Sequence, residues 1–90
     1  MKQFDWNKEK NEALIKTRGV SFEEIVVYIS KGDLLDILEH PDKQKYPGQR
    51  IFVININSYA YYVPFVEDDE RIFLKTIIPS RKLSRKYFNY

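Results

Sequence analysis

Two apolar runs joined by two polar residues constrain this fold more than any other feature of the sequence. Arg50 to Ile56 is rich in Ile, Val and Phe, and Tyr59 to Val66 places apolar and aromatic residues at alternate positions. Asn57 and Ser58 between them favour a tight turn, although Ser is less favourable than Gly at the second position. We therefore expect a β-hairpin at the centre of the fold.

Two more strands are expected, at Leu34–Leu38 and at Arg71–Ile78, and Pro79 ends the second. Pro64 has no amide proton to donate to a strand ladder, so we expect its position to lie on a sheet edge or at a bulge. Phe4–Trp6 has two interpretations, a short strand or an apolar anchor.

Three helices are predicted from their capping residues and apolar spacing. Lys8–Arg18 follows a capping Asn, and Gly19 supplies the left-handed residue that commonly ends a helix. A second helix begins at Phe22, because Ser21 and Glu24 have the spacing of a capping box. Ser80 is able to cap a short basic helix over Arg81–Phe88.

This order of elements predicts the α+β class. With 90 residues, we expect one domain over 1–90. Two N-terminal helices and a short basic C-terminal helix are expected on one face of a four-stranded, mainly antiparallel sheet.

Composition excludes several function classes. The absence of cysteine excludes disulfides, a thiol nucleophile and thiolate metal sites. The longest apolar runs, Ile25–Ile29 and Ile51–Ile54, are far shorter than the ~18 residues of a membrane helix. The charged N-terminus lacks the apolar core of a signal peptide. We expect a soluble, cytoplasmic protein without membrane association.

No pattern points to a metal or a cofactor. The chain has no Gly-rich phosphate loop and a single His, His40. Asp33, Asp36 and Glu39 are close enough in sequence to hold Mg²⁺, but solvated charge explains them better. The same holds for Glu67–Glu70, which forms a polar connection.

Charge is distributed unevenly along the chain. Residues 71–90 carry six basic and no acidic side chains, a formal +6, whereas residues 1–70 carry −4 within an overall +2. A basic C-terminal segment attracts polyanions such as nucleic acid. A solvated C-terminal helix explains the same charges equally well.

Basic and aromatic residues form the remaining constellation. Arg and Lys bind phosphate and stabilise the charge of RNA cleavage by the 2′-hydroxyl, while Tyr rings stack on unpaired bases. The side chains that can converge on one sheet face are Arg50, Arg71, Lys75, Arg81, Tyr59, Tyr61 and Tyr87. His40 is the candidate general base, because its ordinary pKa near ~6.5 suits proton transfer. Alternatively, a perturbed Lys or Tyr serves as the base, or the tyrosines are core residues and the arginines surface charges.

Three motifs occur in the order of a known family. They are Phe4-Asp5-Trp6-Asn7, the run KTRGVSFEE over residues 16–24, and IIPSRK over residues 77–82. The sequence resembles the BrnT family, toxins of type II toxin–antitoxin pairs. Its pattern is F-x-W-D, K-H-G-[VI]-[ST]-F-E-E and I-I-S-A-R, followed by a basic R-x-x-Y tail.

The resemblance implies a RelE-like fold and a metal-independent ribonuclease that blocks translation. It also implies a small antitoxin partner with a ribbon-helix-helix DNA-binding part. Arg81 matches the Arg of I-I-S-A-R, Arg50 the Arg that opens the first long strand, and Lys16 the Lys before H-G. The sequence departs from the pattern in three places: Arg18 replaces the His, Asn7 replaces the Asp, and Pro79-Ser80 replaces S-A.

The predicted function is therefore an RNA-cleaving toxin without a cofactor. The expected catalytic residues are Arg50, Arg81 and His40. The expected RNA-binding residues are Lys16, Arg18, Arg71, Lys75, Tyr61, Tyr87 and Arg85. The alternative is a non-catalytic module that binds a partner protein or nucleic acid through the basic helix and the Tyr-rich sheet.

Overall fold

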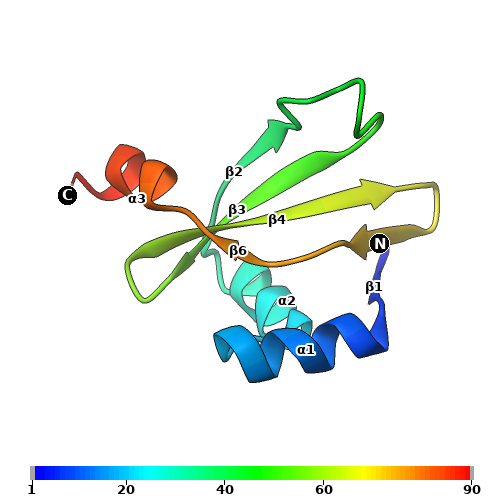
Figure 1. Ribbon diagram of the computed structural model, residues 1–90, viewed down its shortest axis with the longest axis horizontal. Helices are drawn as coiled ribbons and strands as arrows, with labels where there is room; N and C mark the ends of the chain where they lie inside the picture. The colour runs from blue at the N-terminus through cyan, green and yellow to red at the C-terminus, as the bar shows by residue number, and fades with distance from the viewer. Residues whose placement is uncertain (1, 90) are drawn as a thin grey trace.

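The computed structural model describes residues 2–89, which form three helices and a six-stranded sheet. Helices α1 (Lys8–Arg18) and α2 (Phe22–Ser30) lie below the sheet in Figure 1, and α3 (Arg81–Phe88) lies at its upper left. The strands are β1 (Gln3–Trp6), β2 (Leu34–Glu39), β3 (Arg50–Ile56), β4 (Tyr59–Glu67), β5 (Arg71–Leu74) and β6 (Ile78–Pro79). None of the helices in residues 2–89 has the length and apolar composition of a membrane-spanning helix.

The sheet is mixed, with the order β1-β5-β4-β3-β2 and with β6 beside β4. β1 runs parallel to β5, pairing Gln3 with Arg71, and the other strand pairs are antiparallel. The expectation of a four-stranded sheet is therefore wrong, because the sheet has six strands and includes a parallel pair. The Phe4–Trp6 segment is a strand, and the expected strand at Arg71–Ile78 is broken at residues 75–77 into β5 and β6.

Pro64 lies in the inner strand β4 and not on a sheet edge. It pairs with Ile51 of β3 on one side, and its carbonyl accepts from the Lys75 N–H at 2.8 Å on the other. In an antiparallel ladder the N–H and C=O of a residue point the same way. The missing donor of Pro64 therefore faces the break between β5 and β6, where no strand requires it.

The expected hairpin is confirmed. β3 ends just before Asn57, and β4 begins just after Ser58. These two turn residues have φ angles of 53° and 62°. Two positive φ angles are typical of the turn that matches strand twist. The Asn55 side chain accepts from the Ser58 N–H at 2.9 Å, which supports a Ser at a position where Gly is usual.

The three helices also begin where their caps predict. The side chains of Asn7, Ser21 and Ser80 accept from Lys10, Glu24 and Leu83 backbone N–H groups respectively, and the capping box of α2 is complete. Each cap satisfies an N–H group that has no partner within its helix.

Both faces of the sheet are apolar and both are covered. Phe52, Ile54 and Phe65 pack with Phe22 and Ile25 of α2 on one face. On the other face, Leu83, Tyr87 and Phe88 of α3 pack over a second cluster, formed by Ile51, Val53 and Ala60. The expectation that all helices lie on one face is therefore wrong. The continuous apolar run of β3 points side chains to both faces, so each face needs a helix.

Candidate functional site

Two hollows of about 350 Å³ each adjoin on the α3 face of the sheet, and His40 and Tyr62 line both. We call the pair the His40 cleft. The first hollow, between the loop after β2 and the start of α3, is lined by Leu38, Glu39, His40, Pro41, Ile51, Tyr62, Ser80, Lys82 and Leu83. The second hollow is lined by His40, Tyr46, Gln49, Tyr62, Pro64, Lys75, Thr76 and Ile78.

Each side chain of the cleft is positioned by a neighbouring strand. His40 follows β2 directly, and its N–H donates to the Gln49 carbonyl at 3.2 Å, which closes the loop between β2 and β3. Tyr62 pairs with Val53 on one side and with Ile78 on the other, so it is fixed in the middle of the sheet. The break after β5 places Lys75 at the second hollow, with its ammonium 5.4 Å from the centre of the Phe73 ring.

His40 is held by contacts of its own loop. Its Nδ1 accepts from the Asp42 backbone N–H at 3.1 Å, and its ring centre lies 4.4 Å from that of Tyr46. A ring nitrogen that accepts carries no proton, so the neutral ring carries its proton on Nε2. In this arrangement His40 is a hydrogen-bond donor, and it acts as a base through Nδ1 only after releasing Asp42.

The charges at the cleft are mainly positive. Lys75 and Lys82 line it, and Glu39 is the one carboxylate among its described lining residues. The rest of α3 adds Arg81, Arg85 and Lys86 without an acidic residue. Ammonium groups and the Tyr46 and Tyr62 rings line the same hollows, a combination that suits a polyanion with exposed bases such as single-stranded nucleic acid.

The structure does not bring Arg50 to this cleft. Arg50 and Phe52 are two residues apart on β3, so their side chains point to the same face, the one that α1 and α2 cover. There it forms an ion pair with Glu67, and its guanidinium lies 5.2 Å from the centre of the Phe65 ring. Tyr61 packs on the same face.

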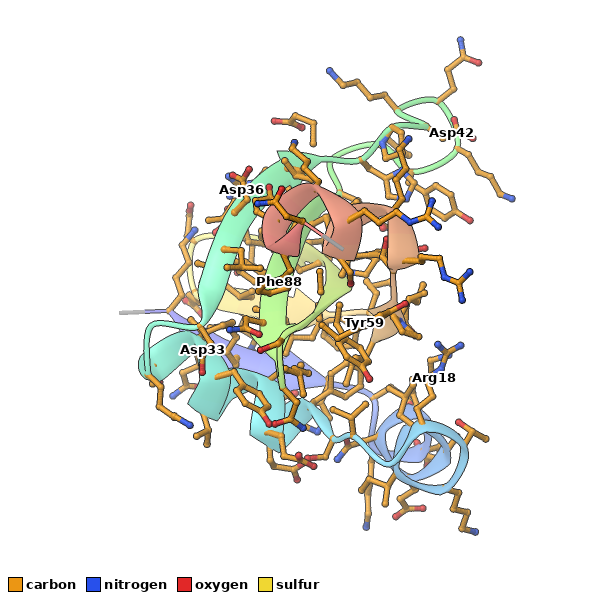
Figure 2. The ribbon with its side chains drawn as sticks, turned by 90° about the vertical axis from the view of Figure 1, so that its left-hand side faces the viewer. Arg18, Asp33, Asp36, Asp42, Tyr59 and Phe88 are labelled. Carbon is orange, nitrogen blue, oxygen red and sulfur yellow. The ribbon has the colours of Figure 1, made fainter. Side chains whose placement is uncertain are left out.

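The other expected RNA-binding residues are dispersed over the molecule. Arg71 pairs with Asp5 at 3.1 Å on the side of the sheet where β1 lies. Lys16 and Arg18 are exposed on α1, and Figure 2 shows Arg18 well separated from Asp42 in the loop after β2. Arg85 is exposed on α3.

Tyr87 fastens α3 to the sheet. Its hydroxyl donates to Asp36 Oδ2 at 2.7 Å, and Figure 2 shows Asp36 on β2 beside the helix. Burial, together with the bond to Asp36, raises the pKa of Tyr87 to about 12. The same bond holds the pKa of Asp36 below its ordinary value. The hydroxyl therefore already has a structural partner.

The structure thus brings together two of the expected residues, His40 and Lys75. Arg81, also expected to be catalytic, lies between the lining residues Ser80 and Lys82 in sequence but does not itself line either hollow. Sequence reasoning missed Lys82 and the group formed by Tyr46, Gln49 and Tyr62. The alternation that places Tyr61 on one face implies Tyr62 on the other, but the sequence does not show which face carries the cleft.

Carboxylates do not gather into a metal site in the described chain. Within residues 2–89, no three His, Asp or Glu side chains are placed to hold a metal ion. Of the three acidic residues considered from sequence, Asp36 accepts from Tyr87 and Glu39 lines the first hollow.

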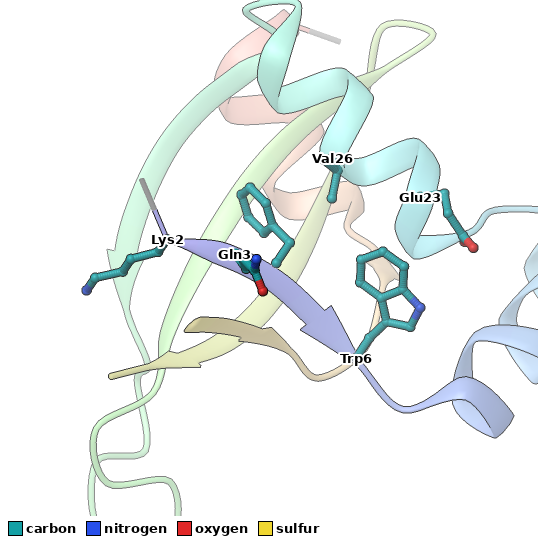
Figure 3. A pocket seen from close by; sticks show the side chains of 6 residues that line it. Lys2, Gln3, Trp6, Glu23 and Val26 are labelled. Atoms are coloured by element: carbon teal, nitrogen blue, oxygen red, sulfur yellow. The ribbon is translucent and has the colours of Figure 1, made fainter. Parts of the chain in front are cut away.

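A further hollow of about 470 Å³ lies between β1 and α2 (Figure 3). It is lined by Lys2, Gln3, Phe4, Trp6, Glu23 and Val26. With one charge of each sign and an apolar wall, it is less suited to a polyanion than the His40 cleft.

No protein family, curated protein or solved structure matches this chain. The chemistry of the cleft and the motif resemblance therefore carry the functional proposal.

Proposed function

We propose that this protein is a cytoplasmic toxin of a type II toxin–antitoxin pair that cleaves RNA without a metal ion and so inhibits translation. The observation that carries the proposal is the His40 cleft, where Lys75, Lys82, Tyr62 and His40 line adjoining hollows. The resemblance of the sequence motifs to the BrnT family supports the same activity. The proposed partner is a small antitoxin of the ribbon-helix-helix type.

The cleft supplies cationic groups that would support RNA cleavage without a metal ion. The 2′-oxygen attacks the adjacent phosphorus and gives up its proton to water, while the bond from phosphorus to the 5′-oxygen breaks and that oxygen takes a proton from water. The products are a 2′,3′-cyclic phosphate and a 5′-hydroxyl. Lys75 and Lys82 stabilise the added negative charge at phosphorus, and His40 donates a hydrogen bond through Nε2–H.

Arg81 completes the set of cationic groups. It begins α3 next to Lys82 and occupies the position of the Arg in the family motif I-I-S-A-R. Because Arg50 lies on the opposite face of the sheet, we assign transition-state charge to Lys75, Lys82 and Arg81 and leave Arg50 outside the reaction.

The state of His40 favours a second function, non-catalytic binding of RNA or a partner protein at the same cleft. Imidazole is the side chain best suited to move protons near neutral pH. Its Nδ1 lone pair is occupied here by the Asp42 N–H. A cleft that binds RNA without cleaving it would use the same lysine and tyrosine side chains and would need no general base.

Purified protein incubated with labelled RNA in excess EDTA separates the two functions. We expect cleavage by the wild type and a loss of about 100-fold or more in the Lys75→Ala/Lys82→Ala variant. Lys8→Ala/Lys10→Ala, which removes the same two charges from exposed positions of α1, is the matched control and should cleave normally. Binding without cleavage by folded wild type, with affinity falling steeply with salt, would establish the binding module instead.

Induced expression in cells tests the toxin activity. Wild-type protein should arrest growth and fragment RNA within minutes, whereas Arg81→Ala should do neither at equal levels of folded protein. Normal growth and intact RNA with soluble, folded wild type would overturn the toxin proposal.

A further inference from the structure

We propose that the His40 cleft binds two consecutive nucleotides of an unpaired RNA strand, one base in each hollow, and that the second hollow alone selects its base. This inference rests on the proposed function. The phosphate between the two nucleotides lies at the wall that His40 and Tyr62 form.

The shape of the cleft carries the first half of the inference. Each hollow measures about 350 Å³, near the lower limit of the ~300–1,000 Å³ typical of small-molecule sites. Their described linings share only His40 and Tyr62, so these two side chains divide the cleft. A division of this size fits one nucleoside on each side and a linking phosphate between them.

The positive charges fit this placement of the two nucleosides and the phosphate between them. Lys82 lines the first hollow and Lys75 lines the second, so one ammonium group lies on each side of the dividing wall. A phosphate at the wall is therefore flanked by a cation from either side. The pairing of two cations with one phosphate matches the charge that develops during cleavage.

The two linings differ in the contacts that they can make with a base. The second hollow combines the Tyr46 ring with the Gln49 amide and the Thr76 hydroxyl, which supply both donors and acceptors for a base edge. The first hollow has a larger apolar share, with Leu38, Ile51 and Leu83. Its own polar side chains are Lys82, Glu39 and Ser80, and the Ser80 hydroxyl already accepts the Leu83 N–H. Hydrogen bonds to base edges discriminate, whereas apolar and stacking contacts tolerate any base.

The same geometry excludes duplex RNA. Two successive bases enter separate hollows only after they leave their partners and unstack, which costs free energy in a duplex and little in a single strand. A hairpin RNA should therefore be cleaved in its loop and spared in its stem.

Cleavage mapping tests the selecting hollow. An unstructured RNA containing all sixteen dinucleotide steps is incubated with the wild type, Gln49→Ala and Gln44→Ala. We expect the wild type to prefer one base at one position of the step and to tolerate all bases at the other. Gln49→Ala should reduce that preference about 10-fold, and Gln44→Ala, altered in the same loop outside the lining, should preserve it. An unchanged preference in Gln49→Ala, or equal cleavage of stems and loops, would overturn the inference.

Binding of an uncleavable probe separates this inference from the activity itself. With 2′-O-methyl RNA, we expect a dinucleotide to bind about 10-fold more tightly than a mononucleotide, and a trinucleotide to add little. Equal affinity for one and two nucleotides would contradict the two-hollow register. Absence of cleavage with the expected length dependence would overturn the proposed ribonuclease and leave the register intact.

Discussion

The Ser84 hydroxyl of α3 accepts the backbone N–H of Ala60 in β4, with 2.7 Å between the two heavy atoms. Both residues are fully buried. The hydroxyl donates in turn to the Ser80 carbonyl at 2.7 Å, and the Ser80 N–H donates to the Ala60 carbonyl at 2.9 Å. The first turn of α3 is therefore fixed to the middle of the sheet beside the His40 cleft.

Replacing Ser84 with Ala should destabilise the protein. The substitution leaves the buried Ala60 N–H without a partner, which costs about 1–3 kcal/mol. Urea unfolding measures the change. Ser30→Ala is the control, because that exposed hydroxyl on α2 only donates to the Val26 carbonyl and should change stability by less than about 0.5 kcal/mol. Equal effects of the two variants would contradict the role of Ser84.

Tyr87→Phe should weaken the attachment of α3 to β2 and lower Tm at pH 7. The raised pKa of Tyr87, about 12, means that its contribution is complete below the ordinary value of 10.0 and is lost as pH rises through about 12. The lowered pKa of Asp36 means that its contribution is present above 3.8 and is lost as pH falls through the lowered value. Between these limits the bond should stabilise the fold.

Ultraviolet titration checks the same pair. The wild type should contain a phenol that ionises near pH 12, and Tyr87→Phe should lack it. Tyr28→Phe, on α2, should retain that late titration. If the last phenol to ionise survives in Tyr87→Phe, the bond to Asp36 does not form in solution.

Asn11→Asp should destabilise the junction of α1 and α2 in a pH-dependent way. The buried Asn11 amide donates to Glu23 Oε1 at 2.7 Å, and its carbonyl oxygen accepts from the Phe22 N–H at 2.8 Å. The hydrogen bond from the Asn11 side chain is the main cause of the lowered pKa of Glu23. The substitution removes that donor and sets two carboxylates together, so we expect a loss of about 1–3 kcal/mol at pH 7.

Protonation at low pH should relieve this repulsion. Comparison of urea unfolding at pH 7 and near pH 3 should therefore show a smaller difference between Asn11→Asp and wild type at the lower pH. The same difference at both pH values would mean that lost packing, and not charge, explains the effect.

Gly19→Ala should lower stability by about 1–2 kcal/mol, because Gly19 ends α1 with a φ of 68° and a β-carbon disfavours the left-handed region. No atom lies within 4 Å of a β-carbon built there, so the cost is conformational and not steric crowding. Gly19→Asn should be milder, since Asn tolerates this backbone. Thermal unfolding of the two variants should rank them in that order.

Features set by neighbouring residues were predictable from the sequence. The caps at Asn7, Ser21 and Ser80 and the turn at Asn57 each depend on residues within a few positions, and all were confirmed. The partner of β1 was not predictable, because its pairing with β5 joins residues almost seventy positions apart. Nothing local shows that the chain breaks its last long strand at residues 75–77.

The candidate site was predictable only in part for the same reason. His40 and Lys75 stand out by residue type, but their proximity depends on the loop after β2 and on the break after β5. Arg50 has the chemistry of a phosphate ligand, yet its face is set by strand register and its partner is Glu67. The role of Tyr62 depends on which face α3 covers, a choice made by tertiary packing.

The parallel pairing of Gln3 with Arg71 and of Trp6 with Leu74 also sets an order of events during synthesis. β1 has no partner until residues 71–74 have been made, and α3, which supplies Lys82 and Leu83 to the cleft, is made later still. Strand pairing between such distant residues is slow to form. A growing chain therefore has no finished cleft until residues 81–83 have been made.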